Sequence, residues 1–172
     1  MKLYVIRHGE TEQGKNKIIA NVKEPLNATG INQAIKVGKD IQKLDIDVVY
    51  CSPMERTKHT LKLFNLDKDI PVIIDNRIIE RNMGKYENMP FEDFNWDILW
   101  DYNSDLKYTE CESMKSVYKR VSEFINDIKS NNDKNVLLVT HGGISRAIYW
   151  FFNGVDKSLF ECENCKIYKY EF

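Results

Sequence analysis

The chain has 172 residues, 42% hydrophobic residues and a formal net charge of -1, which fits one compact domain with a substantial core. The near-neutral charge excludes the broad basic surface that binding to nucleic acid or to an anionic membrane requires. Only four apolar residues follow Met1 and Lys2, too few for a signal peptide, and no later apolar run reaches membrane-spanning length. We therefore expect a single domain over residues 1–172, located in the cytoplasm, with neither a nucleic-acid nor a membrane partner.

The chain contains four cysteines: Cys51, Cys111, Cys162 and Cys165. Because the sequence carries no secretion signal, a disulfide framework is not expected. Cys162 and Cys165 have the spacing of a metal-binding pair, but no second pair of cysteines or histidines completes a zinc site. We predict free thiols and no metal ion or other cofactor.

Short β-rich apolar segments alternate along the chain with segments of helical periodicity. The predicted strands cover residues 3–6, 47–51, 72–74, 136–139 and 167–170. Such alternation is typical of a mostly parallel sheet with helices on both faces. The sequence therefore predicts a three-layer α/β fold.

Four helices are expected between these strands, over residues 27–44, 53–64 and 112–129 and from near Ile144 onward. Two of them carry apolar stripes that we expect to face the core. The stripe of the first helix comprises Ile31, Ala34, Ile35, Gly38 and Ile41. The stripe of the helix over 112–129 comprises Met114, Val117, Val121, Phe124, Ile125 and Ile128.

The alternation fails between residues 82 and 111, a segment rich in aromatic and acidic residues. Active sites of open α/β sheets lie beyond the carboxyl ends of the strands, and an insertion at this point of the chain can shape a substrate cleft there. We expect a lid over about 82–111. A plain surface helix with a loop is an equally open alternative.

Two of the predicted strands run directly into a histidine followed by glycine, at His8 and at His141. Glycine allows close backbone approach, and the helix that begins after His141 offers unpaired N–H groups to an anion. Arg7 precedes the first histidine, and Arg56 lies in the first turn of the helix over 53–64. Two guanidinium groups beside two histidines repel one another unless a dianion such as phosphate lies between them. The sequence therefore predicts a phosphate site.

Six segments resemble the histidine phosphatase superfamily, which is also called phosphoglycerate mutase-like. In chain order they are RHGET, EPLNATGINQA, CSPMERTKHT, IIERNMGKYEN, CESMKSVYKRV and LLVTHGGISR, which begin at residues 7, 24, 51, 78, 111 and 137. Their order and spacing resemble the family pattern over nearly the whole chain. The resemblance implies a phosphoglycerate mutase-like fold and an enzyme that needs no metal.

By this resemblance, His8 is the nucleophile that becomes a phosphohistidine. Arg7, Arg56 and His141 would bind the phosphoryl oxygens, and Glu80 would act as the proton donor to the leaving oxygen and then as the base for water. The chemistry is consistent with these roles, because nearby arginines disfavour protonation of His8 and imidazole is a nucleophile only when neutral. Fixed cationic donors also stabilise the transition state of phosphoryl transfer. Gly142, which follows the second histidine, is a further candidate for binding the substrate.

The sequence departs from the family pattern at several positions. Gly14 replaces a frequent asparagine, so the corresponding phosphate contact is either lost or shifted to Asn16. Tyr86 replaces a tryptophan, and Asn88 replaces a glycine. His59 replaces a glutamine, and we interpret it as a residue on the face of a helix. These changes concern substrate contacts more than the phosphate pocket.

We expect a metal-independent phosphatase that hydrolyses small phosphomonoesters through a phosphohistidine on His8. A cofactor-dependent phosphoglycerate mutase is the first alternative. By the same resemblance, however, mutases of this family would have longer chains and larger insertions around the active site than the segment over 82–111. A non-catalytic module that binds a phosphorylated ligand is an alternative of another class, and the presence of both His8 and Glu80 argues against it. A zinc enzyme built on His8, His59 and His141 lacks a supporting motif.

Overall fold

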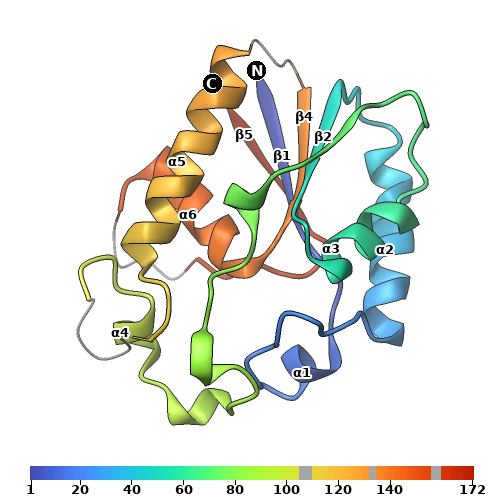
Figure 1. The fold of residues 1–172 in the computed structure, drawn as a ribbon. Helices are drawn as coiled ribbons and strands as arrows, with labels where there is room; N and C mark the ends of the chain where they lie inside the picture. The colour runs from blue at the N-terminus through green and yellow to red at the C-terminus, as the bar shows by residue number, and fades with distance from the viewer. Residues whose placement is uncertain (105–109, 132–134, 156–159) are drawn as a thin grey trace.

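The computed structural model describes residues 1–104, 110–131, 135–155 and 160–172. Five strands form one sheet in the order β3-β2-β4-β1-β5 (Figure 1). They are β1 (Lys2–Arg7), β2 (Val48–Cys51), β3 (Val72–Ile74), β4 (Asn135–Thr140) and β5 (Ile167–Glu171). β5 runs antiparallel to β1, and the other neighbouring strands are parallel. The predicted strands and the mostly parallel sheet are confirmed.

Six α-helices occur in the described part of the chain. They are α1 (Glu12–Lys15), α2 (Ala28–Ile41), α3 (Glu55–Leu63), α4 (Trp96–Leu99), α5 (Met114–Ser130) and α6 (Gly142–Asn153). Short 3-10 turns cover η1 (Asn76–Ile78), η2 (Gly84–Tyr86) and η3 (Phe91–Asp93). In Figure 1, α5 and α6 lie on one side of the sheet and α2 and α3 on the other. Among the described residues, no helix combines the length and the apolar character needed to cross a membrane.

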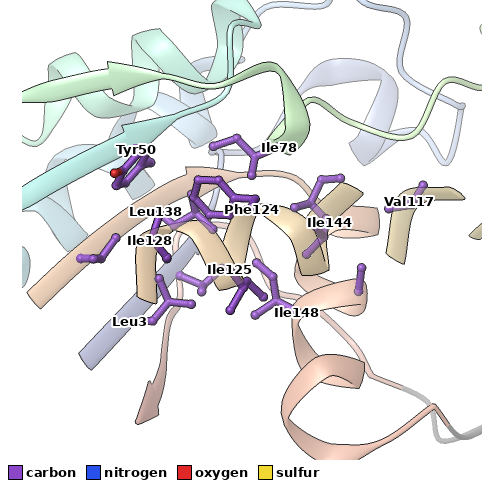
Figure 2. Packing of buried hydrophobic residues seen from close by; sticks show 14 of the residues in the cluster. Leu3, Tyr50, Ile78, Val117, Phe124, Ile125, Ile128, Leu138, Ile144 and Ile148 are labelled. Atoms are coloured by element: carbon purple, nitrogen blue, oxygen red, sulfur yellow. The ribbon is translucent and has the colours of Figure 1, made fainter. Parts of the chain in front are cut away.

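Alternate residues of the central strands pack into two separate cores. On β1, Leu3 and Val5 belong to the cluster formed with α5 and α6, whereas Tyr4 and Ile6 belong to the cluster formed with α2 and α3. Successive side chains of a strand point to opposite faces, so a strand covered on both faces is apolar throughout. Figure 2 shows the first cluster, in which Phe124 and other side chains of α5 pack near the sheet. The predicted apolar stripe of α5 is confirmed, since all six of its residues are buried.

The stripe predicted for α2 is wrong at one position. Ile35 is 44% exposed, and Ile31 is only half-buried. The buried residues of α2 are Gly30, Ala34, Val37, Gly38 and Ile41. A Cβ atom on Gly38 would lie 2.8 Å from Cα of Phe64, so this close backbone contact sets which side of the helix faces the core. Because successive helical residues are about 100° apart, Ile35 is turned toward solvent.

The segment over 82–111 folds around a small apolar cluster of its own, and its residues 105–109 lie outside the described residues. Ile19, from the loop after α1, is buried in this cluster with Phe94 and Leu99. Backbone hydrogen bonds join Ile19 to Asn88 and Met89, each with an N···O distance of 2.9 Å. The segment is therefore fastened to the loop after α1, close to the carboxyl end of β1.

Candidate active site

Three neighbouring strands end side by side at the site. His8 follows β1, Ser52 follows β2 and His141 follows β4. The backbone N–H of His8 donates to the carbonyl of Thr140 (2.9 Å), and that of Ser52 donates to the carbonyl of Val139 (3.0 Å). The ring centres of His8 and His141 are 5.2 Å apart. The sheet thus brings together the two histidines that the sequence placed at strand ends.

The imidazole of His8 is buried and has a defined tautomer. Nδ1 lies 2.8 Å from the carbonyl oxygen of Gly9, which can only accept, so Nδ1 carries the proton. Nε2 then carries the lone pair of the ring, which accepts a hydrogen bond from Nε of Arg56 (3.2 Å). Burial, followed by the charges of Arg56 and Arg7, holds the pKa of His8 well below its ordinary value. His8 is therefore a neutral imidazole, as a nucleophile requires.

His141 is fully buried and has one engaged and one free ring nitrogen. Nε2 lies 2.7 Å from the hydroxyl oxygen of Ser52, whereas Nδ1 has no hydrogen-bond partner among the described residues. Burial, followed by the charges of Arg56 and His8, lowers the pKa of His141 as well. The sequence reasoning missed Ser52, although its place after the predicted strand over 47–51 was a usable signal.

Arg7 and Arg56 present guanidinium groups that contact no carboxylate in the described part of the chain. Nη1 of Arg7 donates to the carbonyl of Cys162 (2.8 Å), and its Nε is buried without a partner in the described part of the chain. Arg56 is 2% exposed, and its Nη1 donates to the carbonyl of Asn21 (2.9 Å). No described carboxylate forms an ion pair with either group. Such groups favour a bound anion.

Glu80 reaches the site from the chain that follows η1. The hydroxyl of Thr140 donates to the carbonyl of Ile78 (2.9 Å) and fixes this chain at the end of β4. Oε1 of Glu80 accepts the backbone N–H groups of Arg81 (2.9 Å) and Gly143 (3.1 Å). A Cβ atom on Gly143 would lie 2.7 Å from Oε1. Glycine at the start of α6 therefore allows the carboxyl group to approach the helix backbone this closely.

A cavity of about 460 Å³ connects these groups with the segment over 82–111. Its polar end includes Arg7, His8, Arg56, Glu80 and Gly142. Its apolar wall includes Phe91, Trp96, Leu99, Trp100 and Phe160. The rings of Trp96 and Trp100 stack with centres 5.9 Å apart, whereas Phe94 is buried behind them in the apolar cluster. The site thus combines a polar end that carries two guanidinium groups with an aromatic compartment.

Two other candidates lie away from the cavity. Asn16 is the exposed C-cap of α1, and its Nδ2 donates to Oε1 of Glu12 (3.2 Å). The structure does not bring Asn16 to the site, and Gly14 is the residue of this helix that lines the cavity. His59 is exposed on α3, as expected for a helix-face residue. Within the described ranges, no group of three or more potential metal ligands occurs.

The segment before β5 supports the site in a way that the sequence reasoning missed. Nδ2 of Asn164 donates to the carbonyl of His8 (2.7 Å), and the N–H of Cys165 donates to the carbonyl of Arg7 (3.0 Å). With the contact from Arg7 to Cys162, three residues of this segment hold the end of β1. The predicted free thiols are confirmed for Cys51, Cys162 and Cys165. The predicted strand over 167–170 was a usable signal, because its pairing with β1 brings the preceding residues 162–165 next to Arg7 and His8.

The model of the histidine phosphatase superfamily (branch 1) matches residues 3–172 of this chain. The chain is 29% identical over 165 residues to putative phosphoserine phosphatase 2 of Hydrogenobacter thermophilus, which covers 90% of this chain and 79% of the relative. It is 30% identical over 152 residues to adenosylcobalamin/alpha-ribazole phosphatase of Escherichia coli, which covers 84% of this chain and 75% of the relative. The crystal structure of phosphoserine phosphatase from Entamoeba histolytica in complex with 3-phosphoglyceric acid superimposes with a TM-score of 0.84 and 25% identity, over 99% of this chain and 90% of the other. This chain is therefore a phosphatase and belongs to the histidine phosphatase superfamily (branch 1).

Proposed function

We propose that this phosphatase hydrolyses small phosphomonoesters through a phosphohistidine on His8, without a metal ion. One observation carries the proposal: the neutral Nε2 of a buried His8 lies beside two guanidinium groups that form no ion pair with a described carboxylate. A phosphoryl group supplies both the electrophile and the negative charge that this arrangement lacks. We also propose that residues 1–172 act as one domain, with 82–111 as its lid.

In the first step, Nε of Arg56 releases its hydrogen bond to Nε2 of His8. The lone pair of Nε2 then forms a bond to phosphorus while the ester P–O bond breaks. Arg7, Arg56 and His141 donate hydrogen bonds to the phosphoryl oxygens, where charge is concentrated in the transition state. Glu80 donates a proton to the departing oxygen, which is a poor leaving group as an alkoxide. The alcohol leaves, and the phosphoryl group stays on His8.

In the second step, Glu80 acts as a base. Its carboxylate accepts a proton from a water molecule that attacks phosphorus, and the P–N bond to His8 breaks. Inorganic phosphate leaves, and both side chains return to their starting protonation states. The N–H groups of Arg81 and Gly143 that bind Oε1 keep the carboxyl group in place through both steps.

Replacement of the nucleophile tests the proposal. His8→Ala protein should release no phosphate from p-nitrophenyl phosphate and should form no acid-labile phosphoenzyme with a radiolabelled ester. His59→Ala, at an exposed position of α3, is the matched control and should retain the wild-type rate. Hydrolysis by the His8→Ala protein at the wild-type rate would refute the mechanism.

Product analysis separates the alternatives. Release of inorganic phosphate from several phosphomonoesters is the expected result for a phosphatase. Interconversion of two phosphoglycerate isomers in the presence of a bisphosphorylated primer, without release, would instead identify a mutase. Binding of phosphorylated compounds with no turnover of any ester would identify a binding module.

A further inference from the structure

Arg146 lies on α6, four residues after Gly142, and lines the same cavity as His8. Its guanidinium carbon is 4.8 Å from the ring centre of Trp100. Its Nη2 donates to the carbonyl of Phe160 (3.0 Å). One contact comes from the segment over 82–111 and the other from the chain that precedes β5. The guanidinium is thus held in a fixed orientation at the wall of the cavity.

The charge of Arg146 has no negative partner in the described part of the chain. Glu161 is exposed at the same cavity, but no described carboxylate forms an ion pair with Arg146. Burial lowers the pKa of Arg146, and the thiol of Cys162 opposes this effect. A guanidinium carries five N–H donors, and the carbonyl of Phe160 is the one acceptor found for them among the described residues. Arg146 can therefore bind an additional acceptor.

Arg81 provides a contrast, because its guanidinium carbon is also near Trp100, at 5.7 Å from the same ring centre. Its three side-chain nitrogens all donate within the protein, to the carbonyls of Glu112 and Leu99 and to Sγ of Cys111. Arg81 is 6% exposed. Arg81 therefore supports the structure of the lid segment, whereas Arg146 is left with donors for a ligand.

We propose that Arg146 is a specificity-determining residue that binds a carboxylate on the alcohol part of the substrate. This inference rests on the proposed phosphatase function and names its substrate class: phosphomonoesters of hydroxy acids. Arg7 and Arg56 serve the phosphoryl group at the polar end of the cavity, and Arg146 offers a second cationic group beside the aromatic wall. Stacking on Trp100 orients the planar fork of Arg146 before the ligand arrives, and such a fork matches a carboxylate in bidentate geometry.

Two matched pairs of esters test this role. 3-Phosphoglycerate and glycerol 3-phosphate differ in a carboxylate against a hydroxymethyl group, and 4-carboxyphenyl phosphate and 4-carbamoylphenyl phosphate differ in the charge of one substituent. In at least one pair, the wild-type kcat/KM should favour the carboxylate by roughly tenfold to a hundredfold, mainly through KM. Arg146→Gln should bring this ratio close to one, and Arg146→Lys should keep part of it. A purely structural role of Arg146 would slow both members of a pair alike.

Lys119→Gln, which removes an exposed positive charge from α5, is the control for net charge and should keep the wild-type ratio. Equal ratios in the wild-type and Arg146→Gln proteins, or no preference in either wild-type pair, would overturn the inference. Failure of the wild-type protein to hydrolyse all four esters would contradict the proposed function instead. In that case the affinity for 3-phosphoglycerate is measured for His8→Ala and for the double variant His8→Ala/Arg146→Gln. Weaker binding by the double variant would support the role of Arg146. Equal binding by the two variants would overturn it.

Discussion

The hydroxyl oxygen of Ser52 lies 2.7 Å from Nε2 of His141, although 89 residues separate them in the chain. The contact arises because β2 and β4 pair in parallel, with Cys51 opposite Val139, so that their following residues meet. Both side chains are fully buried. Ser52 therefore fixes the orientation of a ring whose other nitrogen is left for a ligand.

Ser52→Ala should weaken both the fold and the activity. The change leaves a buried ring nitrogen of His141 without its partner, at a cost of about 1–3 kcal/mol in the free energy of unfolding. Urea denaturation and kcat on p-nitrophenyl phosphate measure the two effects. Ser122→Ala, which removes a hydroxyl bonded to a carbonyl within α5, is the control. Wild-type stability and kcat in Ser52→Ala would contradict the assigned orientation.

The stability of the protein should fall as the pH drops below about 6.5, the ordinary pKa of histidine. His8 and His141 have depressed pKa values in the folded state, so the unfolded chain takes up protons there that the native protein does not. Each histidine then removes about 1.4 kcal/mol per pH unit, until the pH reaches its folded-state pKa. Urea denaturation between about pH 7.5 and pH 5, above the range of ordinary carboxylates, measures this slope. The slope should be about half as steep in His8→Ala, and an equal slope in both proteins would refute the explanation.

Glu80→Gln should separate the two steps of the reaction. An alkyl phosphomonoester needs a proton on its leaving oxygen, so its turnover should fall by roughly 10²–10⁴. p-Nitrophenolate leaves without that proton, so His8 should still capture the phosphoryl group and the phosphoenzyme should accumulate. Rapid quenching and phosphoenzyme labelling measure both quantities. Glu123→Gln, at an exposed position of α5, should behave like wild type, and wild-type turnover in Glu80→Gln would exclude Glu80 from catalysis.

Arg56→Lys should reduce kcat/KM by roughly 10²-fold or more, the loss typical for a donor to the transition state. A lysine ammonium cannot reproduce the planar fork that contacts His8 and Asn21 through different nitrogens. Steady-state kinetics with p-nitrophenyl phosphate measures the loss, and Lys58→Arg on the exposed side of α3 is the reciprocal control. Unchanged kinetics in Arg56→Lys would refute its role in binding phosphate.

The sheet could be predicted from the sequence because each strand is a short apolar run. The central strands are buried by helices on both faces, and the others pair at an edge of the sheet. Which residues of α2 face the core could not be predicted. The close contact between Gly38 and Phe64 determines this orientation, and it joins α2 to the end of α3, far away in the sequence. The apolar β3 also resembles a central strand in sequence, yet its side chains are exposed because it pairs only with β2.

The groups at the centre of the proposed phosphate site could be predicted because Arg7, His8 and His141 directly end or follow their strands. Ser52 and Asn164 lie next to predicted strands, but their hydrogen-bond partners could not be assigned, since these lie 89 and 156 residues away. At such distances, only the order of strands in the sheet reveals the contact.

The departures from the family pattern have local explanations. Asn88 stands where the pattern has glycine, and its φ is 67°, a left-handed conformation that asparagine tolerates better than most residues. Asn16 does not take the place of the asparagine that Gly14 replaces, because at the C-cap of α1 its amide is turned toward Glu12.

The support that residues 162–165 give to Arg7 and His8 has a consequence for biosynthesis. Arg7 and His8 leave the ribosome long before the groups that fix their backbone, because 155 or more positions separate them in the chain. A nascent chain that ends before this segment therefore lacks the contacts that hold Arg7 and His8, however much of its core has already formed. The ends of β1 and of the loop before β5 are therefore joined only after residues 162–165 have been synthesised.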